Sequence, residues 1–253
     1  MTDLERRQAL DDIAAEVRAC TKCRLHETRT KAVPGEGDPE TEVVFVGEGP
    51  GRDEDAQGRP FVGESGRLLT RLIGSLGWAR EEVYITNVVK CRPPGNRDPQ
   101  PDEMAACAGY LDRQLDVLDP ALIVTLGRFS LGTFRPGERI GAVHGTTRPA
   151  NGRDDALAFA MYHPAYAVRD KNNEPILFAD MTGVPGALTE ARRRRKAGDR
   201  SATVPAAASV DQAPAAAAAD QGPGSVRPLE APSIEPTLDP PPADDPVPQL
   251  TLF

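Results

Sequence analysis

Four cysteines are the residues of this chain whose types and spacing could bind a metal. Cys20 and Cys23 form a CxxC pair, and Cys91 and Cys107 follow later in the chain. A CxxC pair can place both sulfur atoms on one metal, and two further thiolates can complete a four-cysteine shell. On spacing alone the set favours zinc, with an iron–sulfur cluster as the alternative, and four unrelated buried thiols fit the pattern less well than either.

The cysteines are not expected to form structural disulfides, because the chain has no feature of a secreted or membrane protein. Residues 1–12 are charged throughout, and no stretch reaches the roughly 18 apolar residues of a membrane span. We therefore expect a cytoplasmic monomer, and in that reducing compartment the thiols remain available for metal binding.

Short apolar runs predict the strands that must position any site. These runs, rich in valine and isoleucine, span residues 42–46, 83–88, 121–126 and 157–162. Helical spacing of apolar residues predicts helices at residues 4–18, around residues 68–76, and from about residue 101 to residue 118. This alternation predicts an α/β protein with a four-stranded parallel sheet, in which ligands bind at the carboxyl ends of the strands.

The segments that leave the predicted strands carry polar residues that could form a site. They are Gly47–Gly51, Asn87–Arg97, Gly127–Arg128 and His163–Ala165. Glycine and proline also punctuate ordinary turns, so the GEGPG segment alone is weak evidence for a site. The Asn87 amide can donate and accept hydrogen bonds together, and His163 leaves the last strand toward the same edge of the sheet.

These motifs closely resemble the type 4 uracil-DNA glycosylases. The resemblance rests on GEGPGRDEDAQGRPFVGESGRLL from Gly47, TNVVKCRPPGNRDPQPDE from Thr86, MYHPAYAVR from Met161, and the four cysteines. It spans about residues 19–180. It implies a three-layer α/β/α sandwich, a [4Fe–4S] cluster on the cysteines, and a DNA-repair enzyme that releases uracil from DNA and leaves an abasic site.

The resemblance also implies roles around a uracil that has been flipped out of the DNA. Phe61 stacks on the base, and Asn87 pairs with the uracil edge and refuses cytosine. His163 donates a hydrogen bond to uracil O2, helped by backbone N–H groups of the turn from Gly47 to Gly49.

The group that activates water is left open by these motifs. Other families of this fold place a water-orienting aspartate at the position of Gly49, so Glu48 is included as a catalytic candidate without a fixed role. The neighbouring carboxylates Asp53, Glu54 and Asp55 are expected to be solvated.

Basic and aromatic residues near the motifs are expected to contact DNA. Lys90, Arg92 and Arg97 share the loop that carries Cys91, so the metal would brace a DNA-facing surface. The last motif lacks the family's usual bulky aliphatic residues, and it leaves Tyr166 and Val168 as alternative wedge residues, with Arg169 expected at a phosphate. The basic run 192–196 fits a solvated helix end and a phosphate contact equally well.

A change in composition divides the chain into a catalytic region, residues 1–196, and a tail. The tail contributes −6 of the net charge of −8, so the catalytic region is nearly neutral and can carry a local basic face. Residues 197–248 are rich in Ala, Pro and Asp and predict a disordered linker.

The final residues resemble the QLxLF peptide by which bacterial repair proteins dock on the sliding clamp. The residues that carry this resemblance are Gln249, Leu250, Leu252 and Phe253. Deleting residues 249–253 is expected to abolish co-elution with the clamp and to leave uracil release from short oligonucleotides intact. Unchanged co-elution would refute the interpretation.

Three other functions fit the motifs less well than uracil release from DNA. A four-cysteine nucleic-acid-binding module without enzymatic activity is disfavoured by the combination of Phe61, Asn87 and His163. A covalent uracil trap would need a histidine in the loop after the second strand, where CRPPGNRDP has none. Phosphate hydrolysis would need a P-loop lysine and serine, which the motifs lack.

Overall fold

The computed structural model of the chain describes residues 1–202, and of these the side chains up to residue 197. The docking peptide predicted at Gln249–Phe253, and most of the predicted linker, lie outside the described residues. Within residues 1–202, none of the helices is both long enough and apolar enough to cross a membrane.

The described residues form one six-stranded sheet with the order β1-β3-β2-β4-β6-β5. Its strands are β1 (Glu36–Gly37), β2 (Val43–Gly47), β3 (Tyr84–Asn87), β4 (Leu122–Leu126), β5 (Thr147–Ala150) and β6 (Arg153–Met161). The four central strands are parallel, and β1 and β5 pair antiparallel at the two edges. The predicted four-stranded parallel sheet is therefore confirmed, with two edge strands added to it.

The two edge strands, β1 and β5, were not predicted from the sequence, for a physical reason. Strand β1 is only two residues long, and β5 is a mostly exposed TRPA segment with a proline. Neither carries the buried β-branched run that marks the central strands, where every residue of β2, β3 and β4 is buried.

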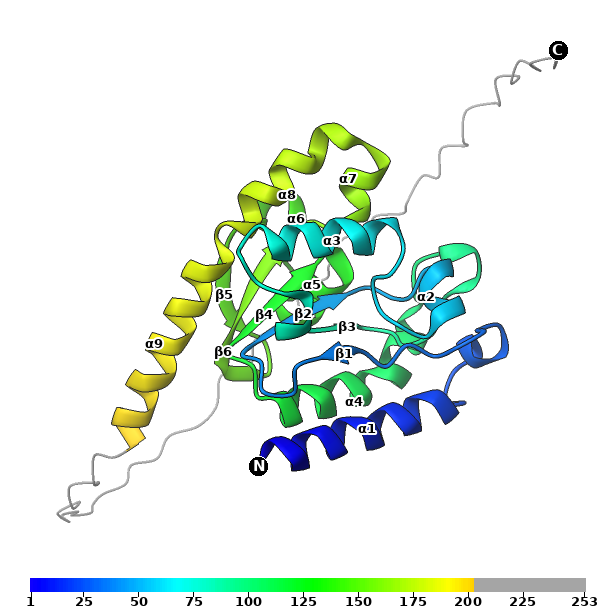
Figure 1. Cartoon of the computed structure of the whole chain (residues 1–253), viewed down its shortest axis with the longest axis horizontal. Helices are drawn as coiled ribbons and strands as arrows, with labels where there is room; N and C mark the ends of the chain where they lie inside the picture. Colours follow the sequence, from blue (N-terminus) through cyan, green and yellow to red (C-terminus); the bar gives the residue numbers. More distant parts are fainter. Residues whose placement is uncertain (203–253) are drawn as a thin grey trace, which may run out of the picture. The chain divides into compact units, whose positions relative to one another are not determined.

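Helices cover both faces of this sheet, as the resemblance implied (Figure 1). Those with eight or more residues are α1 (Asp3–Ala19), α3 (Glu64–Gly74), α4 (Pro101–Leu118), α8 (Glu174–Met181) and α9 (Val184–Ala202). The shorter helices are α2 (Arg52–Gln57), α5 (Arg128–Phe134), α6 (Ile140–Val143) and α7 (Ala165–Arg169). Helices α1 and α4 lie together on one face, and α3, α8 and α9 lie on the other.

The alternation of side chains along a strand builds a separate core on each face. In β2, Val43 and Phe45 pack with α3, α8 and α9, whereas Val44 and Val46 pack with α1 and α4. Burial on both faces explains why the strand reads in the sequence as a continuous apolar run.

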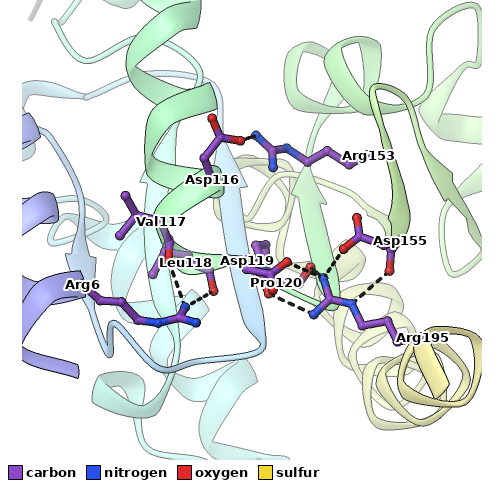
Figure 2. A network of polar contacts seen from close by, with 9 residues as sticks. All are labelled: Arg6, Asp116, Val117, Leu118, Asp119, Pro120, Arg153, Asp155 and Arg195. Carbon is purple, nitrogen blue, oxygen red and sulfur yellow. Dashed lines mark hydrogen bonds and ion pairs between the residues drawn. The ribbon is translucent and has the colours of Figure 1, made fainter. Parts of the chain in front are cut away.

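Three arginines anchor the chain around the carboxyl-terminal end of α4 (Figure 2). Arg6 donates to the carbonyl oxygens of Val117 and Leu118 at 2.9 and 3.0 Å, and Arg153 pairs with Asp116 at 2.8 Å. Arg195 of α9 donates to the carbonyl oxygens of Asp119 and Pro120 and to the carboxylates of Asp119 and Asp155. Cations are favourable there because the last carbonyls of a helix carry partial negative charge.

The basic run 192–196 is thus engaged with the protein in part. Arg195 joins α9 to the end of α4, and Arg192 forms an ion pair with Glu42 just before β2. At these two residues the structure shows ion pairs within the protein, an arrangement that neither the solvated helix end nor the phosphate contact predicted.

Candidate functional site

The register of the parallel strands brings the four predicted strand exits to one edge of the sheet. Gly47 at the end of β2 pairs with Asn87 at the end of β3, and the N–H of Gly127 after β4 donates to the carbonyl of Met161 at the end of β6 at 2.9 Å. A cavity of about 650 Å³ opens at this edge. Among the residues that line it are Glu48, Gly49, Phe61, Ser65, Asn87, Arg97, Asp98, Arg128, Tyr162, His163, Tyr166 and Arg169.

Asn87 presents an unused acceptor at the base of this cavity. Its side chain is buried, and its Oδ1 is the one buried side-chain polar atom of the described residues that has no hydrogen-bond partner. A Cβ atom at position 47 would lie 2.4 Å from this Oδ1 and 2.5 Å from the ring of Phe61. Gly47 is therefore needed to make room for both side chains.

The imidazole of His163 is neutral and has a fixed tautomer. Its Nδ1 accepts a hydrogen bond from the N–H of Ala165 at 3.1 Å, which leaves the ring proton on Nε2. Burial, with a smaller contribution from the cationic Arg169, lowers the pKa of His163 to about 4. The side chain can therefore donate one hydrogen bond from Nε2 without carrying a positive charge.

Phe61 lies beside this histidine, with the two ring centroids 5.5 Å apart and the planes inclined by 30°. The backbone of Phe61 is left-handed, with φ of 50°. Its carbonyl oxygen would be only 1.9 Å from a Cβ atom at position 66, so Gly66 at the start of α3 is required for this turn.

Glu54 holds the Phe61 turn and the GPG turn together, and its role is missed by the sequence reasoning. One carboxylate oxygen accepts the N–H groups of Val62 and Gly63, each at 2.9 Å, and the other accepts the N–H of Gly51 at 3.1 Å. Asp55 is buried and accepts the N–H of Thr30 at 2.8 Å. The expectation that both carboxylates are solvated is wrong, because backbone N–H groups replace water around them.

Glu48 is a half-buried carboxylate that lines the cavity. Burial and the nearby Asp98 raise the pKa of Glu48 to about 6, against the opposing influence of Arg128 and Arg169. A carboxylate tuned to this range can take up a proton near neutral pH, so Glu48 has the properties of a general base.

The predicted DNA-contacting arginines differ in how free their guanidinium groups are. Arg97 lines the cavity, but its two terminal nitrogens donate to Glu103 at 2.7 and 2.8 Å. Arg92 donates to Asn96 at 2.7 Å beside the cavity. Arg169 is exposed at the cavity rim on α7, and Arg128, which the sequence reasoning did not select, is exposed there as an ion pair with Asp98.

Lys90 does not face DNA, although its loop position suggested that it would. Its side chain is fully buried, and its Nζ donates to Thr86 Oγ1, Asn87 O and Gln114 Oε1 at 2.6, 2.8 and 2.7 Å. Burial lowers the pKa of Lys90 to about 8. The loop turns inward here because three oxygen acceptors replace the hydration of the ammonium group.

Tyr166 and Val168, the two alternative wedge residues, line different cavities. Tyr166 lines the cavity and stacks on Tyr162 with centroids 4.5 Å apart. Val168 lines a neighbouring hollow between α3 and α7, and packs against the core on that face of the sheet. Tyr162 in turn contacts His144, which is bound to the buried Asp180 at 2.9 Å.

The four cysteines line one small cavity between α1, the loop after β3, and α4. Three N–H groups donate to their sulfur atoms: Arg29 Nη1 to Cys91 at 3.0 Å, Lys90 N to Cys107 at 3.3 Å, and Lys22 N to Cys20 at 3.5 Å. Burial raises the pKa of Cys91, and raises that of Cys107 to about 11, so thiolates here need a positive partner.

The donor set of this cavity fits a metal–thiolate group. Four cysteine thiolates can bind one zinc ion or hold an iron–sulfur cluster. All four cysteines line the same cavity, so they form one common donor set. The cavity therefore suits either kind of metal site.

These features define an α/β protein with a cavity at the carboxyl ends of its parallel strands, lined by Phe61, Asn87 and His163, and with a second cavity lined by four cysteines. The chain belongs to the uracil DNA glycosylase superfamily, whose family model matches residues 34–181. The resemblance drawn from the sequence motifs is thereby confirmed at the level of the family.

Characterised relatives point to type 4 within that superfamily. The chain is 49% identical over 179 residues to a type-4 uracil-DNA glycosylase of Sulfurisphaera tokodaii, covering 68% of this chain and 81% of the relative. It is 44% identical over 169 residues to that of Thermotoga maritima, covering 67% and 88%. It is 58% identical over 123 residues to that of Archaeoglobus fulgidus, covering 49% and 62%.

Proposed function

We propose that this protein is a uracil-DNA glycosylase that hydrolyses the bond between uracil and deoxyribose in DNA. The observation that carries the proposal is the buried, unpartnered Oδ1 of Asn87, which lies between Phe61 and the end of β2. An unpaired buried acceptor is costly, so the site is incomplete until a ligand supplies a donor. The N3–H group of uracil is such a donor.

Asn87 would distinguish uracil from cytosine by its hydrogen-bonding pattern. Uracil offers a donor at N3 and an acceptor at O4, which match the Oδ1 and the amide N–H of asparagine. Cytosine offers the reversed pattern, and pairing it here would leave buried polar groups facing like groups. The main chain of Asn87 is paired opposite Gly47 in the sheet, which supports this role because the side chain starts from a fixed backbone position.

The neutral His163 suits the chemistry of the departing base. Cleavage of the N1–C1′ bond places negative charge on uracil and positive character on the sugar. The Nε2–H of His163 can donate to uracil O2 as this charge develops, in a site where burial strengthens the interaction. A neutral donor gives this stabilisation without losing a proton to the leaving group at neutral pH.

Glu48 is proposed as the group that orients and deprotonates water. It follows Gly47 directly and lines the same cavity as His163, and the position held by aspartate in other families is Gly49 here. Arg169 and Arg128 at the rim are proposed to bind phosphate groups of the DNA, together with Arg92. Arg97 can join them only by sharing its contact with Glu103.

Replacing Asn87 with alanine tests the recognition of the base. We expect release of uracil from a labelled single-stranded oligonucleotide to slow by about 100-fold, because the edge of the base loses both hydrogen bonds. Alkaline cleavage of the abasic product measures the rate. The control is Asn151→Ala, an exposed asparagine in the turn between β5 and β6, which should keep the native rate. Native activity in Asn87→Ala would contradict the proposal.

The pH dependence of the reaction tests Glu48. Its carboxylate is the active form, so the single-turnover rate should rise from pH 5 to pH 7 with an apparent pKa of about 6. His163, with a pKa of about 4, stays neutral over this range. In a plot of rate against pH, the variant Glu48→Gln should lack this rising limb, and its rate on the plateau above pH 7 should be lower.

The matched control for this titration is Asp98→Asn. It removes a negative charge that raises the pKa of Glu48, so the limb should move to lower pH while the plateau is retained. A limb near pH 6 that persists in Glu48→Gln would assign the titration to another group.

We also propose that the four cysteines hold a [4Fe–4S] cluster. In such a cluster each thiolate binds a different iron, and the four cysteines line one cavity that could hold it. The preference for a cluster over zinc rests on the resemblance of the cysteine pattern to that of type 4 uracil-DNA glycosylases. When bound, the cluster would supply a cross-link between α1 and the loop that follows Asn87. The residues of this chain that contact the uracil are separate from it.

Replacing one cysteine tests this assignment. The native protein should be brown, with broad visible absorbance and about four iron atoms per chain. Cys107→Ser should lose iron and absorbance together. His26→Gln, which changes a non-cysteine side chain of the same cavity, should keep both. Colourless native protein with one zinc per chain would overturn the cluster.

A further inference from the structure

The buried lysine of the loop after β3 is a feature that the function above does not use. Lys90 is 1% exposed, and its ammonium group is enclosed by Thr86, Asn87 and Gln114. Lysine is almost never fully buried without a charged partner. In the part of the chain that the structure describes, no carboxylate lies within ion-pair distance of this group, and the ionisable group that bears on it is the thiol of Cys107.

The hydrogen bonds around Lys90 require its Nζ to carry three protons, as in the charged ammonium form. The hydroxyl of Thr86 donates to Pro34 O at 2.9 Å, so toward Lys90 it acts as an acceptor. The amide nitrogen of Gln114 donates to Pro34 O and Tyr84, so its Oε1 is the group turned to Lys90. The third partner is the carbonyl oxygen of Asn87. Three acceptors need three N–H donors, which only the charged ammonium provides.

The same residue is built into the four-cysteine site. The backbone N–H of Lys90 donates to Cys107 Sγ at 3.3 Å, the next residue is Cys91, and Lys90 lines the cavity between the thiols. Arg29 brings a second cation to Cys91 at 3.0 Å. A [4Fe–4S] core of charge 2+ on four thiolates would leave two negative charges, which Lys90 and Arg29 would offset.

We propose that Lys90 is a positioning residue that couples the four-cysteine metal site to the base-reading Asn87. Its ammonium is the buried counter-charge of the metal–thiolate group, and it binds the main chain of Asn87 while the Asn87 side chain faces the uracil. This inference rests on the uracil chemistry and the cluster proposed above. It explains why a lysine stands at this buried position, since attraction to the thiolates offsets the cost of burying its charge.

The variant Lys90→Met tests the coupling, because methionine fills a similar volume without charge or donors. The holoprotein should keep its iron, but the midpoint potential of the cluster should become more negative, since the reduced form loses a nearby positive charge. The inhibition constant of free uracil should rise, and kcat should fall, by about tenfold or more, the equivalent of one charged hydrogen bond. KM for DNA should stay nearly unchanged because phosphate contacts are not touched.

Lys22→Met is the matched control. It makes the same substitution at a lysine that lines the same cavity but is exposed to solvent, where its charge is screened. We expect native kcat, native uracil inhibition and a smaller change in potential. Should Lys90→Met fail to fold, Thr86→Val removes one acceptor from Lys90 and leaves Pro34 O bound by Gln114, and it should shift potential and uracil inhibition in the same directions.

The outcomes separate this inference from the function on which it rests. A native protein that releases no uracil would overturn the proposed function, whatever Lys90 does. An active Lys90→Met protein with native uracil inhibition, or with a native potential, would overturn the coupling and leave the glycosylase assignment in place.

Discussion

The parallel pairing of β2 with β3 is the constraint on which the rest of the site depends. It sets Gly47 directly opposite Asn87, with no side chain at position 47 to occupy the space between them. That space is filled on one side by the ring of Phe61 and left open on the other as the cavity. Because the backbone hydrogen bonds of a buried parallel sheet are hard to break, the main chain that carries the Asn87 amide has a fixed position before any ligand arrives.

Burial shifts the pKa values of two ionisable groups at this edge of the sheet in opposite directions. It lowers the pKa of His163 and raises that of Glu48, so that one is a neutral donor and the other a carboxylate that titrates near neutrality. Both shifts have the same origin, since burial disfavours whichever form is charged. Partial burial in one cavity therefore leaves a neutral imidazole beside a carboxyl group that titrates near neutrality, which is the pairing that the proposed mechanism uses.

The supporting residues form a layer of contacts behind the site. Glu54 fixes the two turns that carry Gly51 and Phe61, and Lys90 fixes the main chain at Asn87 from the opposite side. Each is a charged group whose hydration is replaced by several hydrogen bonds, so each is specific in geometry. Cys91 directly follows Lys90 in the chain, and the backbone N–H of Lys90 donates to Cys107 Sγ, so the cysteine cavity adjoins this layer.

The sequence by itself determined the central strands, the helices between them, the α/β class, and the placement of Glu48, Asn87 and His163 at one edge of the sheet, whereas Phe61 was selected only through the family resemblance. It could do so because apolar periodicity is local, and because parallel strands present their carboxyl ends at a common edge. The roles assigned to these residues came from a resemblance to a known family, and they remain proposals.

Only the tertiary structure decided which charged residues are buried. Lys90 and Asp55 are expected from the sequence to face DNA or solvent, because a lysine in a loop and a run of carboxylates look alike whether they face water or protein. Their burial depends on acceptors and donors supplied by segments far along the chain, such as Gln114 for Lys90 and Thr30 for Asp55. Long-range partners replace water in each case, and no local pattern of residues records them.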